Sequence, residues 1–160
     1  MFTLNLLLQS LHSVARWVVI LFALIVIIRG LTGWFGKRRF NAADHRYGLF
    51  FTVSFDVQLL LGLILYFTRG WAGVLAGDVV GAMRNSAIRF FAIEHLVLML
   101  IALAVAHIGR SASKKGATDL SQHRRAVLWY TASFILMIAA IPWPFMSYGR
   151  PLLRLFGLEL

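Results

Sequence analysis

The chain has 160 residues, of which 60% are hydrophobic and only 14% are charged, and its mean hydropathy is +0.79. In soluble domains about a quarter of the residues are charged, so this chain has too few charges to cover a surface that faces water. The composition therefore predicts an integral membrane protein and excludes a soluble globular domain. The chain has no cysteine, which excludes disulfides, thiolate zinc sites and iron–sulfur clusters.

The net charge of +10 is distributed in short segments between apolar runs. Such a distribution is typical of topology signals and of contacts with lipid headgroups. No stretch interleaves basic and aromatic residues on a soluble face, so nucleic acid is not an expected partner. The expected partner is the lipid bilayer.

Four apolar runs are long enough to cross a hydrocarbon layer of about 30 Å. They cover residues 4–28, 47–67, 90–108 and 126–141. The stretch from Arg29 to Gly33 is expected to end the first run, and Pro142 ends the fourth because proline cannot continue a helix. The pattern predicts an all-α four-transmembrane-helix bundle that forms a single membrane domain over residues 1–160. Residues 70–89 are expected to form a short outer helix or loop, and residues 145–160 an interfacial tail.

The basic residues predict how the bundle is oriented. Ten lie in or beside the first and third connections, and five lie in the second connection and the tail. The ten are Arg29, Lys37, Arg38, Arg39, Arg46, Arg110, Lys114, Lys115, Arg124 and Arg125, and the five are Arg69, Arg84, Arg89, Arg150 and Arg154. Because cytoplasmic loops carry the excess of lysine and arginine, both termini are expected on the outer (periplasmic) side. The protein is then a multi-pass protein of a bacterial cytoplasmic (inner) membrane.

Five ionisable residues stand at membrane depth: His12 and Arg16 in the first run, Asp56 in the second, and Glu94 and His95 in the third. His12 and Arg16 are four residues apart and therefore share one helix face. Ionisable groups in a bilayer are costly, and by default they face the protein interior and serve a function. His12 and His95 fall in the outer half at depths that agree within about 5 Å. All five groups are expected to converge on one buried site.

Two histidines on different helices at matching depth are the arrangement that a bis-histidine haem b requires. Each imidazole would give one nitrogen to the iron, and Arg16 would face a propionate. Met99 lies one turn from His95 and could approach the same cofactor. Ala102 and Ala106 lie deeper on that face; they either leave room for a bulky group or let helices approach closely, and both uses stay open. The candidate cofactor-binding residues are His12, Arg16, Asp56, Glu94, His95 and Met99.

A second haem would need His45 and His107. His95 and His107 are twelve residues apart and point about 120° from each other, so one helix would not present both to stacked haems. One haem is therefore expected, with His12 and His95 as metal ligands. His45 is expected in the interface, and His123, next to Arg124, is expected in solvent.

The chain carries five short motifs: His12-Ser13-x-x-Arg16-Trp17, Gln58 to Phe67, Glu94-His95, Gly109-Arg110-Ser111 and Ile141-Pro142-Trp143-Pro144. Together they resemble small four-helix bacterial membrane proteins labelled cytochrome b or cytochrome b561-like. This resemblance covers nearly the whole chain, and it implies His12 and His95 as ligands with Arg16 as their charged neighbour. The two well-placed histidine pairs of true cytochrome b561 proteins are absent.

The preferred hypothesis is a b-type cytochrome-like membrane protein with one haem b, acting as an electron carrier or a subunit rather than a stand-alone enzyme. A quinone or another membrane protein would exchange electrons with it, and a larger complex or a homo-oligomer stays open. Two alternatives also stay open. In one, the polar groups form a hydrogen-bonded network that fixes helix register. In the other, a non-redox subunit or proton-coupled protein uses an ion pair of Arg16 with Asp56 or Glu94.

Overall fold

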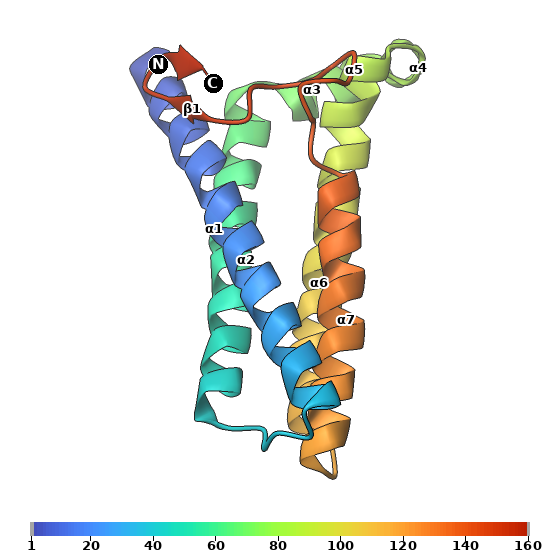
Figure 1. The fold of residues 1–160 in the computed structure, drawn as a ribbon. Helices are drawn as coiled ribbons and strands as arrows, with labels where there is room; N and C mark the ends of the chain where they lie inside the picture. The colour runs from blue at the N-terminus through green and yellow to red at the C-terminus, as the bar shows by residue number, and fades with distance from the viewer. Residues whose placement is uncertain (1, 160) are drawn as a thin grey trace.

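The computed structural model describes residues 2–159, and four long helices form most of it (Figure 1). These are α1 (Phe2–Phe35), α2 (Ala42–Thr68), α6 (His95–Lys114) and α7 (Asp119–Ala139). Helix α6 continues directly from α5 (Ser86–Arg89) and from a π-helical segment, η1 (Phe90–Glu94). Residue 1 and residue 160, the last residue of the expected tail, lie outside the described residues. The prediction of a mainly helical chain is confirmed.

The helices form a closed ring in which α1 packs against α2, α2 against α6, α6 against α7, and α7 against α1. The α1–α2 and α6–α7 connections lie at one end of the bundle, and both termini lie at the other (Figure 1). Three helical stretches have the length and apolar character needed to cross a membrane: Leu4–Phe35, Ala42–Thr68 and Ser86–Lys114. These helices suggest a multi-pass membrane protein in a lipid bilayer.

Helix α1 extends further than the sequence predicts. The expected end between Arg29 and Gly33 is wrong, because the helix continues to Phe35. A Cβ atom on Gly33 would lie 2.2 Å from the His123 ring, and one on Gly30 would lie 2.7 Å from a methyl carbon of Val127. These glycines therefore allow α1 to approach α7 closely. They do not end the helix, as the sequence had predicted.

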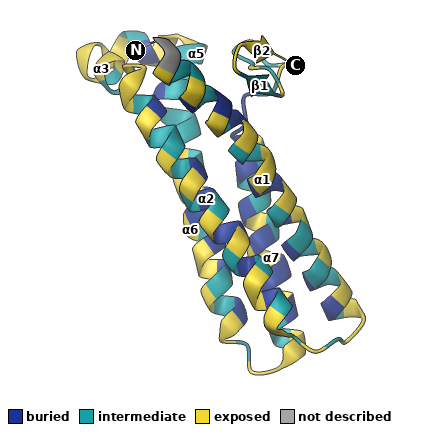
Figure 2. Ribbon diagram, turned by 90° about the vertical axis from the view of Figure 1, so that its left-hand side faces the viewer, coloured by how far each residue is buried: buried dark blue, intermediate teal, exposed yellow. Residues whose placement is uncertain are grey.

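The core runs along the middle of the bundle, where dark buried positions of neighbouring helices face one another (Figure 2). Ala102 and Ala106 of α6 are fully buried there. The hydroxyl of Ser133 on α7 donates to the carbonyl oxygen of Ala102 at 2.7 Å. The small residues of α6 thus allow close helix packing. Of the two uses that the sequence left open, room for a bulky group and close approach of helices, the structure shows the second.

A polar network closes the end of the bundle that carries the α1–α2 connection. Asp44 is buried and accepts hydrogen bonds from Arg29 (3.0 Å), from Arg38 (2.8 Å to each carboxylate oxygen) and from the backbone N–H of Asn41 (2.9 Å). Asn41 in turn caps α2 in a capping box with Asp44. The hydrogen bonds to Asp44 raise the pKa of the Arg38 guanidinium. This network fixes the start of α2 to the end of α1.

His123 belongs to the same end and is fully buried, so the expectation that it is solvated is wrong. Its Nε2 donates to the carbonyl oxygen of Arg38 at 3.1 Å, and its ring packs on Phe40 with centroids 4.8 Å apart. The ring fills the space beside Gly33, which has no side chain. His123 is thus a packing residue that holds α7 against the α1–α2 connection.

The remaining elements lie at the opposite end. Residues 70–89 form α3 (Trp71–Gly77), α4 (Val79–Arg84) and α5 (Ser86–Arg89). The tail ends in a hairpin of β1 (Arg154–Leu155) and β2 (Leu158–Glu159). The turn between the strands has positive φ at Phe156 (46°) and Gly157 (99°), as tight hairpin turns require.

The tail is tied to the first half of α1. The backbone N–H groups of Arg154 and Phe156 donate to the hydroxyls of Ser13 (3.0 Å) and Ser10 (2.9 Å). The indole N–H of Trp17 donates to the carbonyl oxygen of Leu152 at 2.8 Å. The polar positions of α1 thus hold the tail across the end of the bundle.

Candidate functional site

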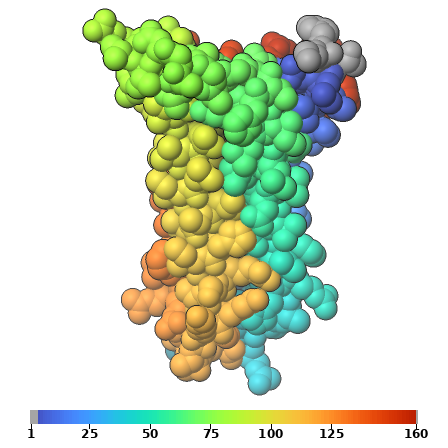
Figure 3. Space-filling model, turned by 180° about the vertical axis from the view of Figure 1, so that it is seen from behind, coloured from blue at the N-terminus to red at the C-terminus, as the bar shows by residue number. Residues whose placement is uncertain are grey.

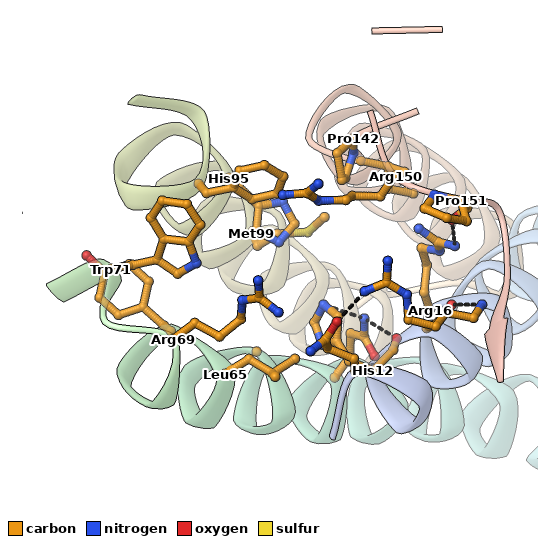
Figure 4. A pocket seen from close by; sticks show the side chains of 18 of the residues that line it. His12, Arg16, Leu65, Arg69, Trp71, His95, Met99, Pro142, Arg150 and Pro151 are labelled. Atoms are coloured by element: carbon orange, nitrogen blue, oxygen red, sulfur yellow. Dashed lines mark hydrogen bonds between the residues drawn. The ribbon is translucent and has the colours of Figure 1, made fainter. Parts of the chain in front are cut away.

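A cavity of about 700 Å³ lies at the end of the bundle that carries both termini (Figure 4). Its wall comes from α1, α2, α3, η1, α6 and α7 and from the tail. This volume falls within the ~300–1,000 Å³ typical of cofactor and ligand sites. His12, Arg16, His95 and Met99 all line it. The structure therefore brings together four of the six candidate residues.

The two histidines face each other from α1 and α6, with ring centroids 6.5 Å apart and ring planes at 69°. Nδ1 of His95 lies 2.7 Å from the carbonyl oxygen of Ala140. A carbonyl oxygen only accepts, so Nδ1 carries the proton and Nε2 of a neutral ring keeps its lone pair. His95 is thus held with one nitrogen prepared to bind an electrophile or a metal.

His12 is held by a neighbour on α2. The side-chain nitrogen of Gln58 lies 3.3 Å from Nε2 of His12 and donates to the His12 carbonyl oxygen at 3.0 Å. Nδ1 of His12 is buried without a hydrogen-bond partner among the described residues. Gly62 lies one turn further along α2, where a Cβ would come within 3.1 Å of Cε1 of His12. The absence of a side chain there keeps space beside the ring.

The π-helical segment η1 directly precedes His95. A π-segment changes the helix register locally and frees a carbonyl group, and such segments are frequent at functional sites. The hydroxyl of Tyr66 on α2 donates to the carbonyl oxygen of Ala92, within η1, at 3.0 Å. This bond joins α2 to η1 directly before His95.

Four arginines line the cavity, whereas Glu159 is its one acidic residue within the described part of the chain. The side chains of Arg16 and Arg69 extend into it (Figure 4). Arg16 donates to the carbonyl oxygens of Pro151 and Leu152, and Arg154 is bonded to Gln9 and Glu159. The pKa of Arg150 is lowered by burial and by the nearby charges of Arg69 and Arg154. This excess of positive charge favours an anionic ligand.

Unpartnered polar atoms gather around the same cavity. The described residues contain seven buried side-chain nitrogen or oxygen atoms without a hydrogen-bond partner, and five of them belong to cavity-lining residues. Buried polar atoms are nearly always hydrogen-bonded, so this concentration indicates a polar or charged ligand. The five atoms are Asn5 Oδ1, His12 Nδ1, Arg16 Nε, Gln58 Oε1 and Arg154 Nε.

The other candidate residues lie elsewhere. Asp56 bonds to His107 at 2.9 Å on the outside of the bundle, and Glu94 bonds to Arg89 at 2.6 Å. His45 is exposed and contacts Phe40 edge-on. The structure therefore does not bring Asp56, Glu94, His45 or His107 to the cavity, and the expected convergence of five groups is limited to His12, Arg16 and His95.

Within residues 2–159 no group of three or more His, Asp or Glu side chains is placed to hold a metal ion. A metal held by His12 and His95 would need its further ligands from a cofactor, and a porphyrin supplies four nitrogens.

The sequence alone did not reveal Gly62 or Arg69 as part of the site. Arg69 directly follows α2 at the end where Arg150 lies, but only the packing shows that the two face one cavity.

Comparisons with known protein families, with curated proteins and with solved structures found no match. The three apolar helical stretches suggest a multi-pass membrane protein. Its candidate site is the cavity lined by two histidines and four arginines.

Proposed function

We propose that this chain is a b-type cytochrome-like membrane protein in which His12 and His95 hold one haem b. It would serve as an electron carrier or as a subunit of a larger redox complex. One observation carries the proposal: two imidazoles with centroids 6.5 Å apart line a cavity of about 700 Å³. Imidazole nitrogens bind metals at ~2 Å, so two rings on one iron have centroids about 6 Å apart.

The hydrogen bonds of both rings support this role. A metal-bound histidine almost always uses its second nitrogen in a hydrogen bond that fixes ring orientation. Ala140 accepts such a bond from Nδ1 of His95, which leaves the lone pair on Nε2. The side-chain nitrogen of Gln58 can only donate, so Nε2 of His12 also has the lone pair and Nδ1 carries the proton. Nε2 of each ring is therefore the atom that would bind the iron, at His12 in place of the contact with Gln58.

The arginines suit the propionates. Arg69 and Arg150 come from the end of α2 and from the tail, and Arg16 and Arg154 lie on the α1 side. Guanidinium groups bind carboxylates with paired hydrogen bonds, and they would hold the two propionates near the bundle end. When bound, a haem supplies one-electron chemistry, and quinone is a candidate exchange partner. The role of this chain's residues is to bind, orient and shield that group.

We place the cavity in the outer half of the inner membrane, with both termini on the periplasmic side. The ten basic residues counted at the first and third connections lie toward the opposite end of the bundle, as a cytoplasmic face requires (Figure 1). Helix α7 is then the fourth span. Its first turns carry His123, Arg124 and Arg125, and its apolar part follows from Ala126.

The alternative of an ion pair between Arg16 and Asp56 or Glu94 has less support. Arg16 bonds to two carbonyl oxygens of the tail, while the two carboxylates pair with His107 and Arg89. The haem proposal would also give carboxylate partners to the buried unpartnered Nε atoms of Arg16 and Arg154.

A visible absorption spectrum tests the proposal. The protein is purified from cells supplied with ample haem, and spectra are recorded before and after reduction with dithionite. We expect the absorption bands of a six-coordinate b-type haem, at about one haem per chain. A colourless protein, both as purified and after incubation with haem, would contradict the proposal.

The substitution Gly62→Leu is expected to lower haem affinity by about ten-fold or more, since disturbing the surroundings of a metal ligand typically costs ~10–100-fold in affinity. The added side chain would occupy the space beside His12, where even a Cβ lies 3.1 Å from the ring. Haem titration monitored by absorbance measures the effect. Gly73→Leu is the matched control, because no atom lies within 4 Å of a Cβ there. Equal affinities of the two variants would contradict the prediction.

A further inference from the structure

Asp56 and His107 form a polar pair on the outer surface of the bundle. Oδ1 of Asp56 and Nε2 of His107 are 2.9 Å apart, and the side chains are 42% and 46% exposed. The pair joins α2 to α6, the two helices that form the face seen in Figure 3. Exposed apolar or small residues surround it on both helices: Val53, Val57 and Leu60 on α2, and Leu100, Ile101, Ala104 and Ile108 on α6.

This position is unusual for a membrane helix. Both residues lie within candidate membrane spans, Asp56 near the middle of α2 and His107 about two turns before the end of α6. Ionisable residues in spans almost always face the bundle interior or a polar cavity, because lipid cannot solvate them. His12, Arg16 and His95 follow this rule. The Asp56–His107 pair would face acyl chains in a lone copy, so another protein surface is expected to cover it.

The pair is complementary to itself. Within the described residues, the hydrogen bond between Oδ1 and Nε2 is the one bond that either side chain makes. The carboxylate only accepts, so Nε2 of His107 carries the donor hydrogen and Oδ2 of Asp56 is an unused acceptor. A two-fold axis along the membrane normal keeps every residue at its own depth. The N–H donor of each copy therefore lies at the same level as the unused acceptor of the other, as a symmetric interface requires.

We propose that a second copy of this chain covers this face and that the protein is a two-fold symmetric dimer through α2 and α6. The Asp56–His107 pairs of the two copies meet at the centre of the interface. Hydrogen bonds between polar side chains stabilise helix association in lipid, and the surrounding apolar side chains pack about them. The dimer is independent of the haem, because its interface lies outside the cavity.

The native chain has no cysteine, so single cysteines report the interface directly. Ala104→Cys and Leu60→Cys place a thiol one turn from His107 and from Asp56. Leu21→Cys on α1 and Leu128→Cys on α7 are matched controls, since both positions are exposed leucines on the other helices. Membranes holding each full-length variant are treated with a mild oxidant. We expect the first two to give a disulfide-linked species of twice the chain mass, at several-fold higher yield than the controls.

A second measurement tests the polar pair itself. Asp56→Leu with His107→Leu, made in the Ala104→Cys background, is expected to lower the cross-linked fraction several-fold while the monomer stays folded and extractable. An unchanged yield would overturn the proposal. Equal yields at all four cysteine positions would overturn it, as would a monomeric mass in lipid nanodiscs or a cross-link to a different protein.

Discussion

Replacing His95 with alanine is expected to abolish haem binding, and His12→Ala is expected to do the same. Each ring provides one of the two protein nitrogens near the cavity that a bis-histidine iron requires, and among residues 2–159 no third histidine lines the cavity. Without either ring, one imidazole and the arginines would be the groups left to hold the haem, and we expect them to be too few to retain it through purification. The measurement is the haem absorbance per chain of the purified variant, which should fall to the background of the haem-free protein.

The controls separate loss of a ligand from loss of the fold. His45→Ala removes an exposed histidine at the other end of the bundle and should leave the spectrum unchanged. His95→Gly makes room for an added imidazole, which should restore the six-coordinate spectrum if the fold is intact. Wild-type spectra from both His12→Ala and His95→Ala would contradict the assignment of these residues as ligands.

The matching depth of His12 and His95 was predictable from the sequence. The order of the spans and the rise of a helix fix the depth of each residue, and both histidines fall at the same level. The direction in which a side chain points is harder to predict. Apolar residues occur on every face of α2, so no pattern in the sequence indicated that Asp56 points outward to His107 rather than into the cavity.

The surroundings of the two ligands were not predictable. The π-helical segment before His95 is bonded to α2 through Tyr66 and Ala92, which are 26 residues apart. The arginines meet at one cavity because the tail folds back over α1, and its hairpin position depends on Ser10 and Ser13. Such contacts follow from tertiary packing, which no local pattern encodes.

The burial of His123 also depends on tertiary packing and could not be predicted from the sequence. Its neighbours Arg124 and Arg125 indicate a solvated position, but helix periodicity turns the imidazole about 100° away from Arg124 and about 160° away from Arg125. The space that receives it exists because Gly33 on α1 lacks a side chain. A glycine in one helix and a histidine ninety residues later can be matched only once the helices are packed.

The substitution Asp44→Ala is expected to lower the free energy of unfolding by about 3 kcal/mol, because removing one partner of a buried ion pair leaves uncompensated charge. The carboxylate is 4% exposed and is shared by Arg29 and Arg38, which are 31% and 33% exposed. Its loss also removes the carboxylate that accepts from the backbone N–H of Asn41 in the capping box. Reversible unfolding in mixed micelles measures the change.

Two further variants show whether the charge is what matters. Asp78 caps α4 at an exposed position through the N–H of Gly81 (2.8 Å), so Asp78→Ala should cost about 1 kcal/mol or less. Asp44→Asn keeps an acceptor but not the charge, and its effect should fall between the two. A loss in Asp44→Ala no larger than that of Asp78→Ala would contradict the prediction. Because Asp44 lies at the end of the bundle opposite the cavity, the folded fraction of Asp44→Ala should still bind haem with wild-type affinity.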